Sequence, residues 1–68
     1  SFVYRSGNEL IVNAEGKVQI LDVMGRVVYN RDIVDSNHRI NISAFNSAAY
    51  IIRVVNTNEV KTQKVVIW

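Results

Sequence analysis

Hydrophobic and polar residues alternate along several short segments of the chain, which is the pattern of β-strands with one buried face. Residues 17–20 and 39–43 show it most clearly, because every second side chain there is apolar. A two-residue period puts one face of a strand inward and the other in water. No long stretch keeps the period of about 3.6 residues that an amphipathic helix requires. Val and Ile supply 20 residues against two Leu, and branched side chains favour strands.

Seven strands are predicted, each bounded by Gly, Asn, Ser or Asp. They span residues 2–5, 9–13, 17–22, 27–31, 38–43, 49–55 and 60–68. The connections are too short for parallel crossovers, which need a dozen or more residues. The predicted fold is therefore all-β, a seven-stranded antiparallel sandwich of immunoglobulin-like type.

Two of these strands have unusual patterns. Residues 50–55 are apolar on both phases except at Arg53, which predicts a central strand covered on both faces or nearly so. In the last segment, Thr62 and Lys64 share a phase with two valines. The inner face of this strand is ambiguous, and a β-bulge could reset its phase.

Two tight turns support the antiparallel architecture. In residues 22–26, Gly25 can take the positive φ that a tight hairpin demands, and Asp22 can cap the turn through its side chain. Residues 56–59 join the last two strands, and the Asn residues there tolerate left-handed φ. Both segments are predicted to be hairpin turns.

Length and charge narrow the classes of function. The 68 residues predict one small domain, and the formal charge of +2 comes from scattered residues rather than from the basic face that nucleic-acid binding needs. The absence of Cys excludes disulfides and thiol nucleophiles. The chain begins without Met and without a signal-peptide leader, so residues 1–68 are interpreted as a fragment of a longer exported protein.

Candidate catalytic and metal-binding residues are sparse. His38 is the only imidazole, and no nucleophile motif accompanies it, so we interpret it as a polar residue at a strand start. The six carboxylates are dispersed along the chain and are interpreted as solvated charges, Asp35 among them. We therefore expect no enzyme activity, no metal site and no cofactor.

Several motifs occur in a characteristic order along nearly the whole chain. Residues 17–29 form an alternating strand, then Asp22, two spacers, Gly25-Arg26 and a second apolar strand. Tyr50 precedes another apolar strand, and near the end stand a Lys and three apolar residues: Lys64, Val65, Val66 and Ile67. Together these features resemble the type A C-terminal sorting domain of cargo proteins of the bacterial type IX secretion system, also called the Por secretion system. Ala48 stands where that family usually has Gly.

The resemblance implies that the domain is a sorting signal rather than a catalyst. Such a domain directs a covalently linked N-terminal passenger through the periplasm and the outer membrane to the cell surface or the medium. Its implied partners are the type IX translocon and sortase components, and a sortase-like protease usually removes it and anchors the passenger to surface lipopolysaccharide. We expect the last strand, residues 60–68, to be the main element that the machinery recognises, and the Gly25-Arg26 turn to be the next candidate. The residues expected to take part are Lys64, Val65, Val66, Ile67, Gly25 and Arg26. Asp22 and Tyr50 are expected to be structural.

A non-catalytic adhesive or carbohydrate-binding sandwich at the cell surface is the alternative function. It would need an exposed ligand surface, whereas Phe45 and Tyr50 are interpreted as core and Trp68 is left open between the two roles. The terminal strand has no Pro, and Lys61 and Lys64 are its only charged residues that would oppose pairing with another strand edge. A weak homodimer through this strand is therefore expected at high concentration.

Overall fold

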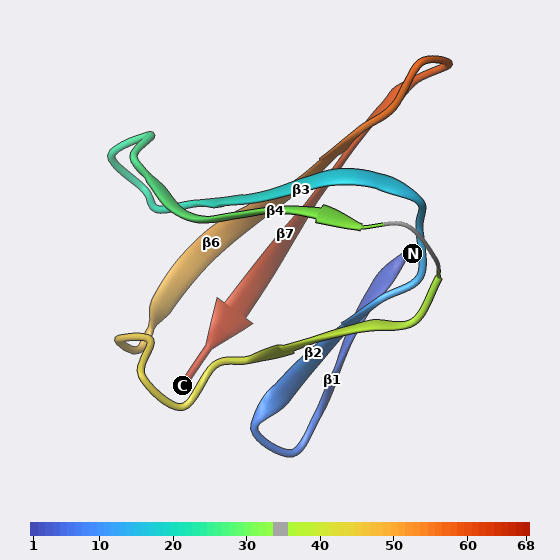
Figure 1. The fold of residues 1–68 in the computed structure, drawn as a ribbon. Coiled ribbons are helices and arrows are strands. Elements are labelled where there is room, and N and C mark those ends of the chain that lie inside the picture. Colours follow the sequence, from blue (N-terminus) through green and yellow to red (C-terminus); the bar gives the residue numbers. More distant parts are fainter. Residues whose placement is uncertain (34–35) are drawn as a thin grey trace.

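Across the residues that the computed structural model describes, 1–33 and 36–68, the chain forms seven strands and no helix. Two antiparallel sheets face each other (Figure 1). The three-stranded sheet has the order β1-β2-β5 and the four-stranded sheet the order β4-β3-β6-β7. The strands are β1 (Val3–Ser6), β2 (Glu9–Val12), β3 (Gly16–Leu21), β4 (Val27–Ile33), β5 (His38–Asn41), β6 (Ala48–Val55) and β7 (Val60–Ile67). The predicted all-β, two-sheet antiparallel fold is confirmed.

Three of the connections are hairpins, and the other three cross from one sheet to the other. Hairpins join β1 to β2, β3 to β4 and β6 to β7. Between them, β5 returns to pair with β2, and β6 returns to pair with β3. Long-range pairing therefore holds the middle of the chain together, while the hairpins β3–β4 and β6–β7 supply the four strands of the larger sheet.

The core lies between the sheets and is built from the inward residues of each strand. On β3, Val18 and Ile20 are fully buried while Lys17 is exposed, as the alternation predicts. Burying one such aliphatic side chain contributes about 1.5–3 kcal/mol. The buried cluster consists of Val3, Leu10, Val12, Ala14, Val18, Ile20, Ile40, Ile42, Tyr50, Ile52, Val54 and Ile67.

The prediction that β6 is covered on both faces is wrong. Tyr50, Ile52 and Val54 are buried, whereas Ile51 is 38% exposed and Arg53 is exposed. A two-layered sandwich has only one interior, so the outer face of even a central strand borders water. The apolar residue Ile51 therefore contributes to the outer surface.

The inner face of β7 is set by residues that the sequence pattern left ambiguous. Its register with β6 runs without interruption from Val60 to Ile67, so β7 needs no bulge. A register shift occurs instead in the pairing of β3 with β4, where Val28 is skipped between the pairs Ile20–Tyr29 and Leu21–Val27. Ile67 is buried and Val65 is half-buried, while Lys64 and Val66 are exposed. Polar side chains thus share the inner phase of this strand.

The turn between β6 and β7 forms as predicted, but for a different reason. The backbone amides of Asn58 and Glu59 donate to Oδ1 of Asn56 at 2.9 and 3.0 Å. Among the described non-glycine residues, only Asn37 has a positive φ, of 64°. A side-chain cap therefore replaces the left-handed backbone expected at this turn.

Gly16, at the start of β3, allows the backbone to pass close to the end of β6. Its φ is 134°, and a Cβ added there would lie 2.5 Å from the carbonyl oxygen of Val55. A side chain at this position meets backbone that cannot rotate away. Glycine is thus required where the chain enters the four-stranded sheet.

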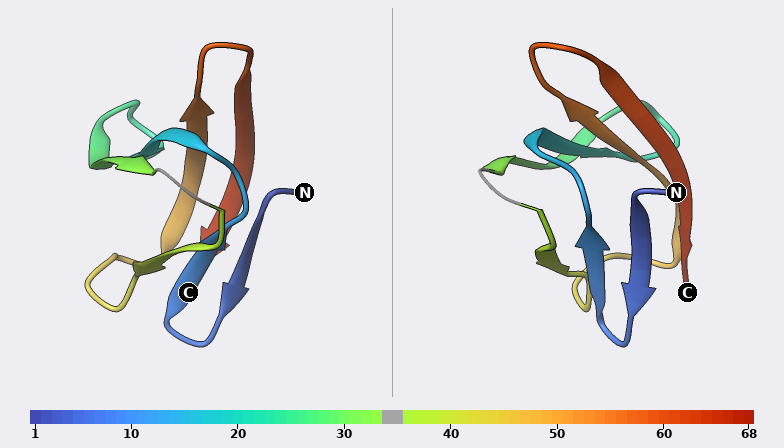
Figure 2. Two further views of the ribbon diagram at one scale, coloured as in Figure 1. Left: turned by 45° about the vertical axis from the view of Figure 1, so that its right-hand side comes forward. Right: turned by 90° about the vertical axis from the view of Figure 1, so that its right-hand side faces the viewer.

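Side chains close both flanks of the sandwich. On one flank, the backbone amides of Phe2 and Val3 donate to Oε1 of Gln63 at 3.0 and 3.1 Å, and Nε2 of Gln63 donates to the carbonyl of Val3 at 2.7 Å. We call this set of bonds the Gln63 clasp; it holds β1 beside β7 (Figure 2). On the other flank, the hydroxyl of Tyr29 lies 2.9 Å from Nε2 of His38. His38 begins β5, as predicted.

Candidate functional site

The turn between β3 and β4 is held rigidly by one carboxylate. Oδ1 of Asp22 accepts the backbone amides of Met24 and Arg26, each at 2.9 Å, and its Oδ2 accepts Nε of Arg26 at 2.8 Å. These donors, the Arg26 backbone amide foremost, hold the pKa of Asp22 below its ordinary value. Gly25 has a φ of 81°. Both the cap and the positive φ predicted for this turn are confirmed.

The fixed turn projects apolar side chains into solvent. Val23 is 75% exposed and Met24 is 76% exposed, although exposing apolar side chains to water does not stabilise the fold. The Arg26 side chain is also well exposed. The turn thus presents two apolar side chains and a cation from a backbone that hydrogen bonds keep in place.

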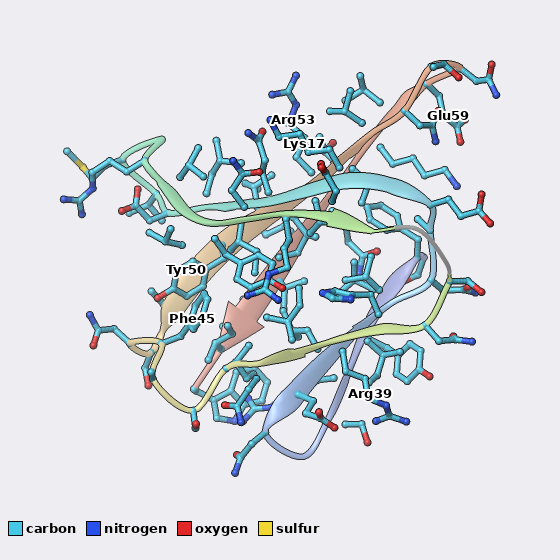
Figure 3. The ribbon with its side chains drawn as sticks, in the orientation of Figure 1. Lys17, Arg39, Phe45, Tyr50, Arg53 and Glu59 are labelled. Carbon is cyan, nitrogen blue, oxygen red and sulfur yellow. The ribbon has the colours of Figure 1, made fainter. Side chains whose placement is uncertain are left out.

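A shallow groove of about 490 Å³ lies on the outer face of the four-stranded sheet, next to this turn. Cross-strand register places Leu21 of β3 opposite Ile51 of β6, and Ile51 opposite Lys64 of β7. In Figure 3 Arg53 and Lys17 lie on this outer side, while Tyr50 and Phe45 lie between the sheets. The groove is lined by Leu21, Gly25, Ala49, Ile51, Arg53 and Lys64, and by neighbouring parts of the turn.

Tyr50 fixes the connection that leads into β6. Its hydroxyl donates to the carbonyl of Asn46 at 2.8 Å, and its ring meets Phe45 edge-on, with centroids 5.4 Å apart. Ala48 begins β6 and is not among the residues with positive φ, so alanine fits where the resembling family has glycine. Tyr50 is buried and Phe45 is packed against the core, as predicted.

The residues expected to be recognised divide between the surface and the core. Gly25 and Lys64 line the groove, Arg26 belongs to the turn beside it, and Val66 pairs with Ala49 at its margin. Val65 packs against the core, and Ile67 is only 4% exposed. The fold therefore brings the hairpin turn and the outer phase of the last strand to one place, and turns the inner phase away from it.

Five residues that line the groove were not among the predicted site residues: Leu21, Val23, Ala49, Ile51 and Arg53. Leu21 and Ile51 had been assigned to strands without a surface role, and Arg53 had only marked an interruption in an apolar run. That interruption was the available signal, because a lone cation among apolar residues shows which phase of the strand faces water.

β7 is also an edge strand. It is hydrogen-bonded to β6 on one side, and β1 belongs to the other sheet. Side-chain bonds from Gln63 and a bond from Arg5 Nη1 to the carbonyl of Trp68, at 3.2 Å, link the two edges. Main-chain groups on the free side of an edge strand are available for pairing.

Residues 1–33 and 36–68 hold no group of three or more His, Asp or Glu side chains placed to share a metal ion. The same residues include no helical segment with the length and hydrophobicity of a membrane span. Asp35, predicted to be a solvated charge, lies outside the described residues.

Comparison with known protein families gives one match that covers most of the chain. The family described as "Secretion system C-terminal sorting domain" matches residues 5–68. Comparison with curated proteins and with solved structures found no match. The matched range includes the β3–β4 turn, the groove and all of β7.

Proposed function

Because this chain belongs to the C-terminal sorting domains of the type IX secretion system, we propose that its groove and last strand are the surfaces by which the export machinery recognises it. The domain is a sorting signal for type IX secretion, which implies export across the outer membrane to the cell surface or the medium. The observation that carries the proposal is the meeting of Gly25 and Lys64 at one groove.

The sandwich is, in this proposal, immunoglobulin-like. If β1 to β7 are named A to G in chain order, one sheet has the strand order A-B-E and the other D-C-F-G. The adjacent strands C, F and G match one sheet of the immunoglobulin fold. The bond from Tyr50 to Asn46 supports the same assignment. Immunoglobulin-like domains carry a tyrosine at the start of strand F whose hydroxyl bonds back to the preceding connection.

Recognition combines two kinds of contact. Main-chain groups along the free edge of β7 can pair with a receptor strand, which supplies affinity, while side chains on one phase supply selectivity. Lys64 and Val66 provide that phase on β7, and the rigid turn adds Gly25 and Arg26. Val65 and Ile67 act indirectly, by anchoring the strand in the core.

The later steps of sorting belong to the partners. The domain itself is not an enzyme in this proposal and uses no metal or cofactor, and its partners do not include nucleic acid. A sortase-like protease removes it from the covalently linked N-terminal passenger and attaches the passenger to surface lipopolysaccharide. In this proposal the folded sandwich is the part of the cargo protein that the export machinery binds.

The proposal is tested by fusing the chain behind a secretable reporter in a host with a working type IX system. The wild-type fusion should reach the surface, and deletion of residues 64–68 should leave the reporter in the periplasm. Because the deletion also removes Val65 and Ile67 from the core, it is compared with Lys64→Ala, which spares them. Lys17→Ala, on the same sheet face but outside the groove, is the matched control.

Loss of export in Lys64→Ala, with an unchanged thermal midpoint and normal export of Lys17→Ala, supports recognition through this surface. Normal export of the deletion variant would show that the last strand carries no address. An equal loss of export in both alanine variants would indicate that net charge matters rather than the groove.

A further inference from the structure

The groove combines two cationic side chains with an apolar floor. Lys64 lies directly opposite Ile51, and Arg53 is the next residue of β6 on the same face. Arg53 and Lys64 are thus diagonal neighbours on adjacent strands, which places their side chains about 7–8 Å apart. Ile51, which neighbours both of them, is 38% exposed.

Neither cation is neutralised within the part of the chain that the structure describes. The ion pairs there join Arg26 to Asp22, Arg39 to Glu9 and Lys61 to Glu59. Nη1 of Arg53 donates only to a neutral amide, Oε1 of Gln19, at 3.3 Å. The one carboxylate that lines the groove, Asp22, already accepts three donors from the turn. The groove therefore has an excess of positive charge.

This charge argues against a second copy of the chain as the occupant. A two-fold dimer through the outer face would bring the same patch against itself and place Arg53 and Lys64 near their own counterparts. Like charges at an interface disfavour the pairing. The spacing fits an extended peptide better, because alternate residues of a strand are about 6.6 Å apart, close to the separation of the two cations.

We infer that the groove binds an extended, acidic segment of a protein partner, which places carboxylates at alternate positions on Arg53 and Lys64 and an apolar side chain on Leu21 and Ile51. The inference rests on the proposed function, since it names the chemistry of the segment that the export machinery offers. It also assigns Arg53 a role in specificity. The exposed apolar residue Val23, at the edge of the groove, adds contact area for the same segment.

The test is a titration of the isotopically labelled 68-residue chain with short synthetic peptides, followed by NMR. The first peptide carries Glu, Glu and Leu at alternate positions, separated by Ser. Matched peptides replace both Glu by Gln, both Glu by Lys, or Leu by Ser. We expect the first to shift amides of residues 21–25, 49–53 and 63–65, and to bind more weakly as salt rises, because exposed charges are screened.

Variants of the chain separate the groove from general charge. Arg53→Glu and Lys64→Glu should each weaken binding of the acidic peptide by about tenfold, since reversal turns an exposed attraction into a repulsion of similar size. Arg39→Glu makes the same change in net charge on β5 of the other sheet, away from the groove, and should alter binding by less than about twofold. Arg53→Gln provides a second variant if the reversal disturbs folding.

Equal binding of the Gln or Lys peptide would overturn the inference, because an apolar floor alone would then suffice. Shifts in the same residues that grow with protein concentration and without peptide would instead identify a second copy as the occupant. Binding to phosphatidylglycerol vesicles, lost in Arg53→Glu and not accompanied by peptide binding, would identify a lipid surface. If the acidic peptide fails to bind while export still requires Lys64, the inference falls and the proposed function stands.

Discussion

Replacing Gln63 by Ala should remove a large part of the stability of this domain. The substitution breaks the Gln63 clasp, which comprises two bonds from backbone amides and one to the carbonyl of Val3. Each hydrogen bond contributes about 0.5–1.5 kcal/mol net, and two of these share one oxygen, so the expected loss is about 2 kcal/mol. A domain of this size without disulfides has about 3–5 kcal/mol in total. Gln63→Ala should therefore lose about half of its stability.

Urea denaturation followed by circular dichroism measures this loss. With a slope of about 1 kcal/mol per molar urea for a small protein, the midpoint should fall by about 2 M. Thr62→Ala, at the adjacent exposed position, loses strand propensity alone and should cost less than about 1 kcal/mol. Amide exchange at Val3 should also accelerate in Gln63→Ala. A loss no greater than that of Thr62→Ala, with Val3 still protected, would refute the assigned role of the clasp.

Three further variants test other features of the fold. Gly16→Ala should destabilise the domain by more than 1 kcal/mol, roughly the cost of a strained backbone position, because its Cβ meets the carbonyl of Val55; thermal unfolding measures this. Asp22 has a lowered pKa, so its contribution to stability is present above the ordinary value of 3.8 and is lost as pH falls through the lowered one; urea midpoints measured against pH should fall less in acid for Asp22→Asn than for the wild type. Tyr50→Phe should cost about 1 kcal/mol through loss of the bond to Asn46, and an unchanged chemical denaturation midpoint would contradict that bond.

The alternating segments could be predicted well because alternation has one physical cause. On β3 the inward residues Val18 and Ile20 are buried and Lys17 is exposed, as a two-layered fold requires. The turn at residues 22–26 was equally predictable, since an Asp cap and a Gly with positive φ act locally. Neither feature depends on distant parts of the chain.

Which residues of β6 and β7 face the core could not be predicted, because their positions depend on contacts with residues far away in the sequence. Gln63 takes an inward position on β7 through bonds to the backbone of β1, about sixty residues earlier in the chain. Ile51 is apolar and faces outward, where it lines the groove rather than the core. An apolar pattern shows which side chains are better removed from water. It does not show whether they are buried in the interior of the fold or by a binding partner.

The Gln63 clasp also determines how tension travels through the domain. A passenger attached ahead of β1, as the proposed function implies, would pull on the backbone of Phe2 and Val3, and that backbone is bonded directly to a side chain of β7. The first and last strands lie side by side and point the same way (Figure 2), although they belong to different sheets. A tensile load from such a passenger would therefore reach β7, the strand proposed to carry the sorting signal, through one side chain, as well as reaching β2 through its pairing with β1.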